Sequence, residues 1–220
     1  MTQRQLPYSF CQADNILAIM QHMPNRTIAL KQIKDEVVNL TQSPLYTERI
    51  KNKMLPVIGE GNHQAKIMFV GEAPGRNEAI YGRPFCGAAG KLLDELLASV
   101  GIPRQDVYIT NIVKDRPTNN RDPLPAEIEI YGPFLDRQIN IIQPAVIVTL
   151  GRYSMIYIMT KFGLQHKLTN ISNMHGQLFT TTTSYGPLAI LVQYHPAAAL
   201  YNGSLRTTLA KDFQALRQYI

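Results

Sequence analysis

The chain has 220 residues, of which 45% are hydrophobic, and a chain of this length usually buries one sizeable core within a single domain. Its two cysteines, Cys11 and Cys86, exclude a disulfide framework and a site of four thiolates, and they indicate a reducing intracellular compartment, either cytoplasm and nucleoid or nucleus. The net charge of +6 suits a polyanionic partner such as nucleic acid, and no membrane partner is expected because no apolar run is long enough to span a bilayer.

The amino-terminal part of the chain has a helical pattern. Apolar spacing within residues 9–40 predicts two helices, which are separated by a break at Pro24-Asn25. We expect residues 1–54 to form a helical extension that packs on one domain covering residues 1–220. No motif assigns this extension a role.

From residue 65 onward, apolar runs alternate with amphipathic ones. The apolar runs predict core strands at residues 65–70, 107–110, 146–150 and 188–193, and hairpin-like strands lie around residues 180–183. The amphipathic runs predict helices at residues 88–100, 125–142, 151–159 and 204–219. This alternation predicts an α/β fold, a three-layer α/β/α sandwich around a mostly parallel four-stranded sheet.

In such sheets, binding sites form on the loops beyond the carboxyl ends of the strands. Glu72, Asn111 and His195 each lie within two residues of a predicted strand end. Polar groups at separate strand ends are expected to converge, so these side chains are candidates for one site.

Two motifs surround these positions. The first, VGEAPGRNEAIYGRPFCGAAG at residues 70–90, runs from a strand into a glycine-rich turn and an acidic loop, and the second is YHPA at residues 194–197. The glycine spacing does not match a dinucleotide-binding loop, and no acidic residue stands at the expected offset after a second strand. A Rossmann enzyme is therefore poorly supported.

Together with VYITNIVKDRPTNNRDPLPAEI at residues 107–128 and PAVIVTLG at residues 144–151, these motifs resemble the family-4 uracil-DNA glycosylases over about residues 55–215. The resemblance implies a monofunctional DNA N-glycosylase of base excision repair, which flips uracil out of DNA, hydrolyses its glycosidic bond and leaves an abasic site. Uracil-containing DNA is then the partner, and we expect a monomer.

The resemblance assigns three side chains to the flipped base. Phe85 stacks on the ring, Asn111 reads the edge by donating to O4 and accepting from N3–H, and His195 stabilises the charge that develops at O2. Each residue also has an ordinary structural interpretation: a core phenylalanine, an asparagine in a turn and a structural histidine.

Further residues are assigned to chemistry and specificity. Ala73 stands where other branches of the superfamily carry a water-activating aspartate, so we expect a dissociative mechanism in which Glu72 orients water or base. Glu78 is expected to crowd C5 of uracil and exclude thymine, and the backbone N–H of Ala73 to contact the base. Both carboxylates are equally compatible with solvated loop positions.

Contacts to the DNA backbone are expected from the helix that opens at Gly87 and from the proline-rich loop after Asn111. An alternative for the small residues near Gly87 is close packing, and the loop is otherwise solvated. A wedge into the emptied base stack is expected from the segment after His195. The loop and wedge candidates are Lys114, Arg116, Asn120, Arg121, Leu200 and Tyr201.

Family-4 enzymes hold a [4Fe–4S] cluster on four cysteines, and this chain retains none of them. The first two positions fall within residues 40–44, and the other two align with Asp115 and Tyr131. Because such clusters require thiolates, we predict that the protein has no cluster, no other cofactor and no metal. In place of the cluster, we expect side chains packed around Tyr131. No role is assigned to His175.

Two other functions remain open on the same fold. One is a non-catalytic DNA-binding or replication-associated protein, and the other is a glycosylase for another deaminated or mismatched base. The presence of Glu72, Phe85, Asn111 and His195 favours the enzyme, because a degenerate domain is expected to lose its pocket residues first.

Overall fold

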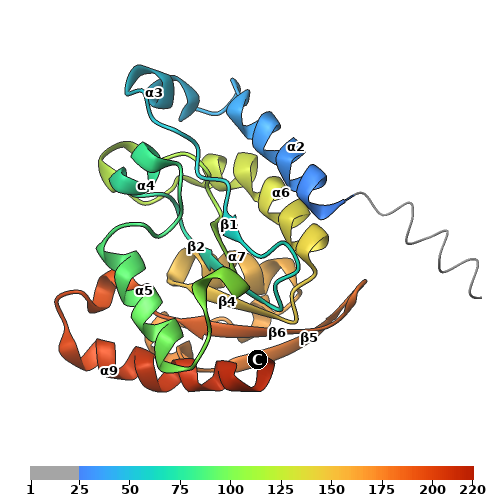
Figure 1. Cartoon of the computed structure of the whole chain (residues 1–220), viewed down its shortest axis with the longest axis vertical. Coiled ribbons are helices and arrows are strands. Elements are labelled where there is room, and N and C mark those ends of the chain that lie inside the picture. Colours follow the sequence, from blue (N-terminus) through green and yellow to red (C-terminus); the bar gives the residue numbers. More distant parts are fainter. Residues whose placement is uncertain (1–24) are drawn as a thin grey trace, which may run out of the picture.

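The computed structural model describes residues 25–220, so the first predicted helix lies outside the described residues. Six strands form a single sheet in the order β1-β3-β2-β4-β6-β5 (Figure 1). Their bounds are β1 Glu60–Gly61, β2 Ile67–Gly71, β3 Tyr108–Asn111, β4 Val146–Leu150, β5 Leu178–Thr183 and β6 Gly186–Gln193.

The four inner strands run parallel, as predicted, whereas the number of strands is higher than predicted. Two antiparallel edge strands account for the difference: β1 pairs with β3, and β5 pairs with β6 as a hairpin. β1 is only two residues long and has no apolar pattern, so its sequence carries no strand signal.

Eight α-helices cover the sheet within the described residues. Their bounds are α2 Arg26–Val38, α3 Tyr46–Lys51, α4 Arg76–Tyr81, α5 Ala88–Ser99, α6 Pro125–Ile142, α7 Arg152–Lys161, α8 Ile171–Met174 and α9 Gly203–Asp212. The last helix is shorter than predicted, because the chain tightens into a 3₁₀ helix over Phe213–Tyr219. None of the helices in this part of the chain is long and apolar enough to cross a membrane.

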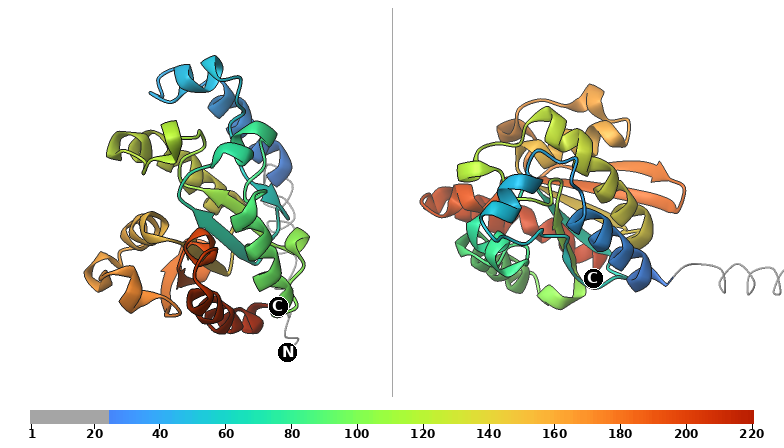
Figure 2. Two further views of the ribbon diagram at one scale, coloured as in Figure 1. Left: turned by 90° about the vertical axis from the view of Figure 1, so that its left-hand side faces the viewer. Right: turned by 90° about the horizontal axis from the view of Figure 1, so that it is seen from above.

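The two faces of the sheet bury separate apolar layers, because successive side chains of a strand point to opposite faces. In β2, Met68 and Val70 face the layer under α2, α6 and α7, whereas Ile67 and Phe69 face the layer under α5 and α9. The further views in Figure 2 show red α9 beside green α5, with blue α2 and yellow-green α6 packed together elsewhere. The predicted three-layer α/β/α fold is therefore confirmed.

The described part of the predicted amino-terminal extension packs on α6. Asn25 caps α2 by accepting a hydrogen bond from the Thr27 N–H, and Ile33 and Val37 of this helix are fully buried. The Arg26 guanidinium donates to the carbonyl oxygen of Ile142 at the end of α6. The buried side chains of this segment therefore join the main core.

The order of the inner strands determines where a ligand can bind. β2 lies at the centre, the chain passes first to β3 on one side of it, and then returns to β4 and β6 on the other side. Ligands in open α/β sheets bind beyond the carboxyl ends of the strands at such a reversal. At this edge β3 ends at Asn111, and Glu72, Gly151 and His195 lie in the segments that follow β2, β4 and β6.

Candidate active site

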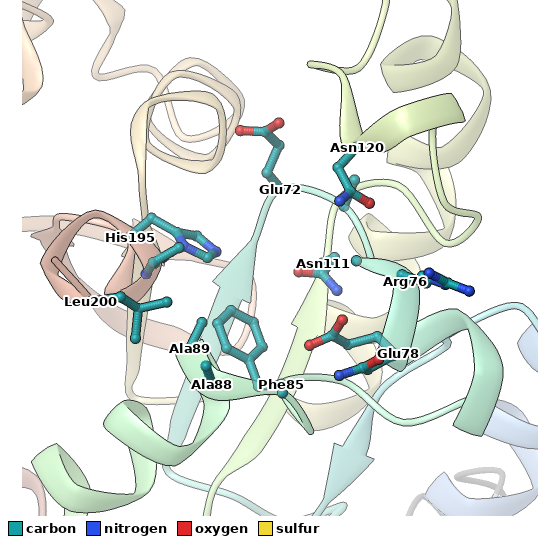
Figure 3. A pocket seen from close by; sticks show the side chains of 15 residues that line it. Glu72, Arg76, Glu78, Phe85, Ala88, Ala89, Asn111, Asn120, His195 and Leu200 are labelled. Carbon is teal, nitrogen blue, oxygen red and sulfur yellow. Dashed lines mark hydrogen bonds between the residues drawn. The ribbon is translucent and has the colours of Figure 1, made fainter.

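A cavity of about 500 Å³ opens at this edge of the sheet. Its volume lies within the usual range for small-ligand sites. In Figure 3, side chains from the end of β3, from α4 and α5, and from the segments that follow β2 and β6 surround it. The predicted residues that line it are Glu72, Ala73, Glu78, Phe85, Gly87, Asn111, Asn120, His195 and Leu200.

The protonation state of His195 is fixed by its neighbours. Its Nδ1 accepts a hydrogen bond from the Ala197 N–H at 3.1 Å, so in the neutral ring the proton resides on Nε2. Burial lowers the pKa of His195 to about 4, which keeps the ring neutral at physiological pH. The side chain is thus a neutral imidazole whose free N–H is available to a ligand.

Phe85 forms the apolar floor of the cavity. Its ring is 5% exposed and stacks on the His195 ring with 5.5 Å between centroids. Its backbone φ is +48°, a left-handed conformation that is uncommon for a bulky residue and typical of functional sites. Phe85 therefore belongs both to the core and to the site.

Two glycines allow these groups to approach one another. A Cβ on Gly71 would come within 2.3 Å of Asn111 Oδ1 and 3.0 Å of the Phe85 ring. A Cβ on Gly90 would come within 1.7 Å of the Phe85 carbonyl oxygen, where the first turn of α5 meets the Phe85 backbone. A side chain at either position would displace Asn111 or Phe85.

Asn111 is the last residue of β3 and is only 2% exposed. Within residues 25–220 its carboxamide has no hydrogen-bond partner, although its main-chain oxygen accepts from Lys114 Nζ at 2.6 Å. A buried amide without partners offers one donor and one acceptor in a fixed position, as recognition of a base edge requires.

The two carboxylates differ in their surroundings. The pKa of Glu72 is raised to about 7, mainly by burial and further by the nearby Asp122, while Arg152 opposes both effects. Glu72 is half-buried above the end of β2, whereas Glu78 projects from α4 toward the region between Asn111 and Phe85 (Figure 3). Glu72 therefore changes charge near neutral pH.

The predicted DNA contact of Lys114 is wrong in this structure. Lys114 is fully buried, and its Nζ donates to Thr110 Oγ1, the Asn111 carbonyl and Gln138 Oε1 at 2.6–2.8 Å. Burial lowers the pKa of its ammonium group. A lysine that is satisfied by three internal acceptors supports β3 and α6 and does not reach a phosphate.

The other predicted DNA contacts lie at or near the cavity rim. Arg116 donates to the Asn120 side chain at 2.7 Å, and Arg121 forms a two-point ion pair with the buried Glu127 at the start of α6. Arg121 is thus engaged by Glu127 and is not free for DNA. Leu200 lines the cavity, and Tyr201 beside it is 97% exposed.

The sequence reasoning missed some supporting residues. Arg76 and Asn77 of α4 line the cavity, and the only sequence signal for them is their place directly after the proline-glycine turn. His175 also has a partner: its Nδ1 lies 2.7 Å from Asp212 Oδ2, and its ring stacks on Tyr194 with centroids 4.6 Å apart.

The residues at the expected cluster positions do not fit an iron–sulfur cluster. Ser43, Asp115 and Tyr131 offer a hydroxyl, a carboxylate and a phenol in place of thiolates, and these groups are hydrogen-bonded to one another. Across residues 25–220 the structure has no group of three or more His, Cys, Asp or Glu side chains placed to hold a metal.

The model of the Uracil DNA glycosylase superfamily matches residues 58–219. The chain belongs to the uracil DNA glycosylase superfamily. This membership confirms the expectation of a DNA N-glycosylase, and the matched range includes the whole cavity described above.

Within this superfamily, the chain is similar to several glycosylases named Type-4. It is 46% identical to a Type-4 uracil-DNA glycosylase of Sulfurisphaera tokodaii over 86% of this chain and 84% of that protein. It is also 46% identical to one of Archaeoglobus fulgidus, over 83% of this chain and 90% of that protein. A DNA polymerase of Bacillus phage SP01 is 32% identical over 73% of this chain but only 16% of that protein.

Proposed function

We propose that this protein is a monofunctional uracil-DNA glycosylase, which hydrolyses the N-glycosidic bond of deoxyuridine in DNA, releases uracil and leaves an abasic site. The observation that carries this proposal is the meeting of Asn111, Phe85 and His195 at one cavity, although they come from three separate segments. Uracil-containing DNA is the partner, and the protein acts as a monomer.

In this proposal, the flipped uracil lies on the face of Phe85 and its polar edge meets Asn111. The Asn111 amide donates to O4 and its oxygen accepts from N3–H. Cytosine inverts this pattern of donor and acceptor, and a mispaired polar edge costs about 1–3 kcal/mol. Glu78 stands beside C5, where it excludes the methyl group of thymine.

His195 lowers the barrier to bond cleavage. When the C1′–N1 bond breaks, its electron pair passes to uracil, and negative charge develops on O2. The Nε2–H of neutral His195 donates to this oxygen, and the hydrogen bond strengthens as the charge grows. A neutral donor stabilises the leaving anion without having to transfer a proton first.

The sugar that remains is oxocarbenium-like and is captured by water. Ala73 has no carboxylate to activate this water, so the step depends on the cation and not on a strong base. Glu72, when ionised, orients the water and the backbone N–H of Ala73 contacts the base. The water oxygen bonds to C1′, one of its protons leaves, and uracil is protonated on release.

No lyase step accompanies this reaction. A Schiff base requires a free amine at the sugar, and within residues 25–220 no lysine lines the cavity. The reaction uses no metal or other cofactor, and we propose that the chain carries no iron–sulfur cluster. On the DNA side, Leu200 and Tyr201 enter the emptied stack, whereas Gly87, Arg116 and Asn120 contact the backbone.

The test is excision of uracil from an oligonucleotide, with abasic sites revealed by alkali. Wild-type protein is expected to cleave the uracil strand, and His195→Ala is expected to lower the single-turnover rate by about 10²–10³-fold. His166→Ala, which changes an exposed histidine away from the cavity, is the matched control. Asn111→Asp is expected to lose uracil excision and is also tested on cytosine.

Parallel oligonucleotides with hypoxanthine or mismatched thymine test the base range. Binding of the uracil strand without alkali-labile breaks would replace the proposal with a non-catalytic DNA-binding protein. Faster release of another base would change the substrate. Wild-type rates in both His195→Ala and Asn111→Asp would remove the site assignment.

A further inference from the structure

A buried polar network lies behind the active site, where four segments of the chain meet. Ser43 stands between α2 and α3, Arg49 belongs to α3, Asp115 follows β3, and Tyr131 belongs to α6. All four residues are buried, with at most 5% of their surface exposed. Arg49 Nη1 lies 3.1 and 3.2 Å from the two oxygens of Asp115, and Tyr131 Oη lies 2.6 Å from Asp115 Oδ2.

The hydrogen atoms of this network have one consistent arrangement. Burial raises the pKa of Tyr131, so its hydroxyl keeps its single proton and donates it to the Asp115 carboxylate, which can only accept. Ser43 must then donate to the Tyr131 oxygen, at 2.7 Å, and it accepts from the Leu45 N–H at 3.1 Å. Each hydroxyl is satisfied once as donor and once as acceptor.

The same network closes the end of α2. Arg49 also donates to the carbonyl oxygens of Val37 and Val38 in the last turn of that helix. A single guanidinium therefore joins α2 and α3 to the loop after β3, and Tyr131 extends the connection to α6.

Three members of this network occupy the region that the resemblance assigns to cluster ligands. Ser43 lies within residues 40–44, and Asp115 and Tyr131 align with the two later cysteines. These positions are distant in sequence, yet Tyr131 is hydrogen-bonded to both Ser43 and Asp115, so the fold brings all three together. Where the resemblance implies metal–thiolate bonds, this chain has hydrogen bonds and an ion pair.

We infer that the Ser43–Arg49–Asp115–Tyr131 network performs the structural task of the missing cluster and positions the loop that connects Asn111 to the DNA-binding rim. Asp115 lies four residues after Asn111 and directly precedes Arg116, which bonds to Asn120 at the cavity. Anchoring Asp115 thus holds the loop between Asn111 and Arg116, and the network acts through positioning rather than through contact with the base.

The experiment compares Asp115→Asn and Arg49→Met with the wild type in thermal unfolding and in uracil-excision kinetics. Each change leaves a buried partner uncompensated and is expected to lower Tm by about 10 °C. Because the loop after Asn111 is then no longer held in place, KM for DNA is expected to rise roughly tenfold while kcat changes less than about twofold. Tyr131→Phe, which keeps the ring, is expected to show a smaller shift in both quantities.

Asp136→Asn is the matched control. Asp136 also accepts from a tyrosine hydroxyl and pairs with a cation, Lys161, but it is only half-buried and does not touch the loop. Its change is expected to leave KM at the wild-type value. A double-mutant cycle of Arg49→Met with Asp115→Asn is expected to show strong coupling, because both changes break the same ion pair.

The inference is overturned if Asp115→Asn and Arg49→Met leave both Tm and KM unchanged. It is also overturned if the purified wild-type protein contains about four iron atoms and four acid-labile sulfides per chain, with the broad visible absorption of a cluster. Unfolding and iron analysis do not depend on the proposed enzymatic function, so an inactive wild type would reject that function without affecting these two measurements.

Discussion

Glu72 and His195 face the same cavity with pKa values displaced in opposite directions. Burial raises the pKa of Glu72 to about 7 and lowers that of His195 to about 4. A neutral histidine and an ionised glutamate therefore coexist only above about pH 7. This is the combination that the proposed mechanism requires.

The first prediction concerns the pH dependence of excision. Wild-type activity is expected to rise as pH increases through about 7, because Glu72 loses its proton there, and to show no step near pH 6.5 from His195. Glu72→Gln is expected to be slower and to lack the rise. Single-turnover rates from pH 5 to 9 measure this, and a rise that persists in the variant would assign it to another group.

The same residue predicts an effect on stability. The folded pKa of Glu72 lies above its ordinary value of 4.5, so the cost of ionising it appears as pH rises from about 4.5 and is complete above about 7. Glu72→Gln is expected to be more stable than wild type by about 1–2 kcal/mol at pH 8, allowing for solvent screening, and equally stable at pH 4. Chemical denaturation at the two pH values tests the sign.

Lys114 yields a third prediction. Lys114→Met keeps the length of the side chain but leaves three buried acceptors without their donor, so a loss of stability of about 2 kcal/mol is expected. Because the ammonium group is internal, the salt dependence of DNA binding should stay unchanged. A reduced salt slope in this variant would restore Lys114 as a phosphate contact.

The locations of lysine and arginine side chains were the ones that the sequence predicted least well. Their usual location is the surface, so Lys114 and Arg121 were assigned to DNA, and nothing local in the sequence indicates otherwise. The acceptors that hold Lys114 come from β3 and α6, and the partner of Arg121 is a buried glutamate of α6. Such partners become visible only when the tertiary structure brings them together.

At the scale of elements, the apolar runs were a reliable guide. The inner strands and α5, α6 and α7 appear where their patterns predict, because burial on a sheet face requires a particular side-chain period. β1 and α4 were not predicted. β1 is held by pairing with β3 and α4 is a six-residue helix within the turn motif, so neither depends on a pattern of its own.

The first turn of α5 gives the fourth prediction. Gly90→Ala places a methyl group against the Phe85 carbonyl, so the Phe85 backbone must shift and excision is expected to fall by about 10²-fold. Gly203→Ala, in the first turn of α9, meets no atom within 4 Å and is the matched control. Wild-type rates for Gly90→Ala would mean that the position of Phe85 is not critical.

For the molecule as a whole, the net charge of +6 predicts salt-sensitive DNA binding. Arg76→Ala, at the cavity rim, is expected to weaken binding and to reduce the slope of log K against log salt by about one. Lys31→Ala removes the same charge from α2, where it lies beside Asp35 and away from the cavity, and should leave the slope unchanged. Equal slopes for both variants would contradict a localised binding face.

Helix α9 does not line the cavity, yet its final residue, Asp212, contacts His175. The His175 ring in turn stacks on Tyr194. Tyr194 immediately precedes His195, the residue that we propose stabilises the leaving base. Truncating the chain before Asp212 is therefore expected to loosen the segment that carries His195, even if every cavity-lining residue were retained. Engineers who shorten or circularly permute this scaffold need to preserve that remote tether.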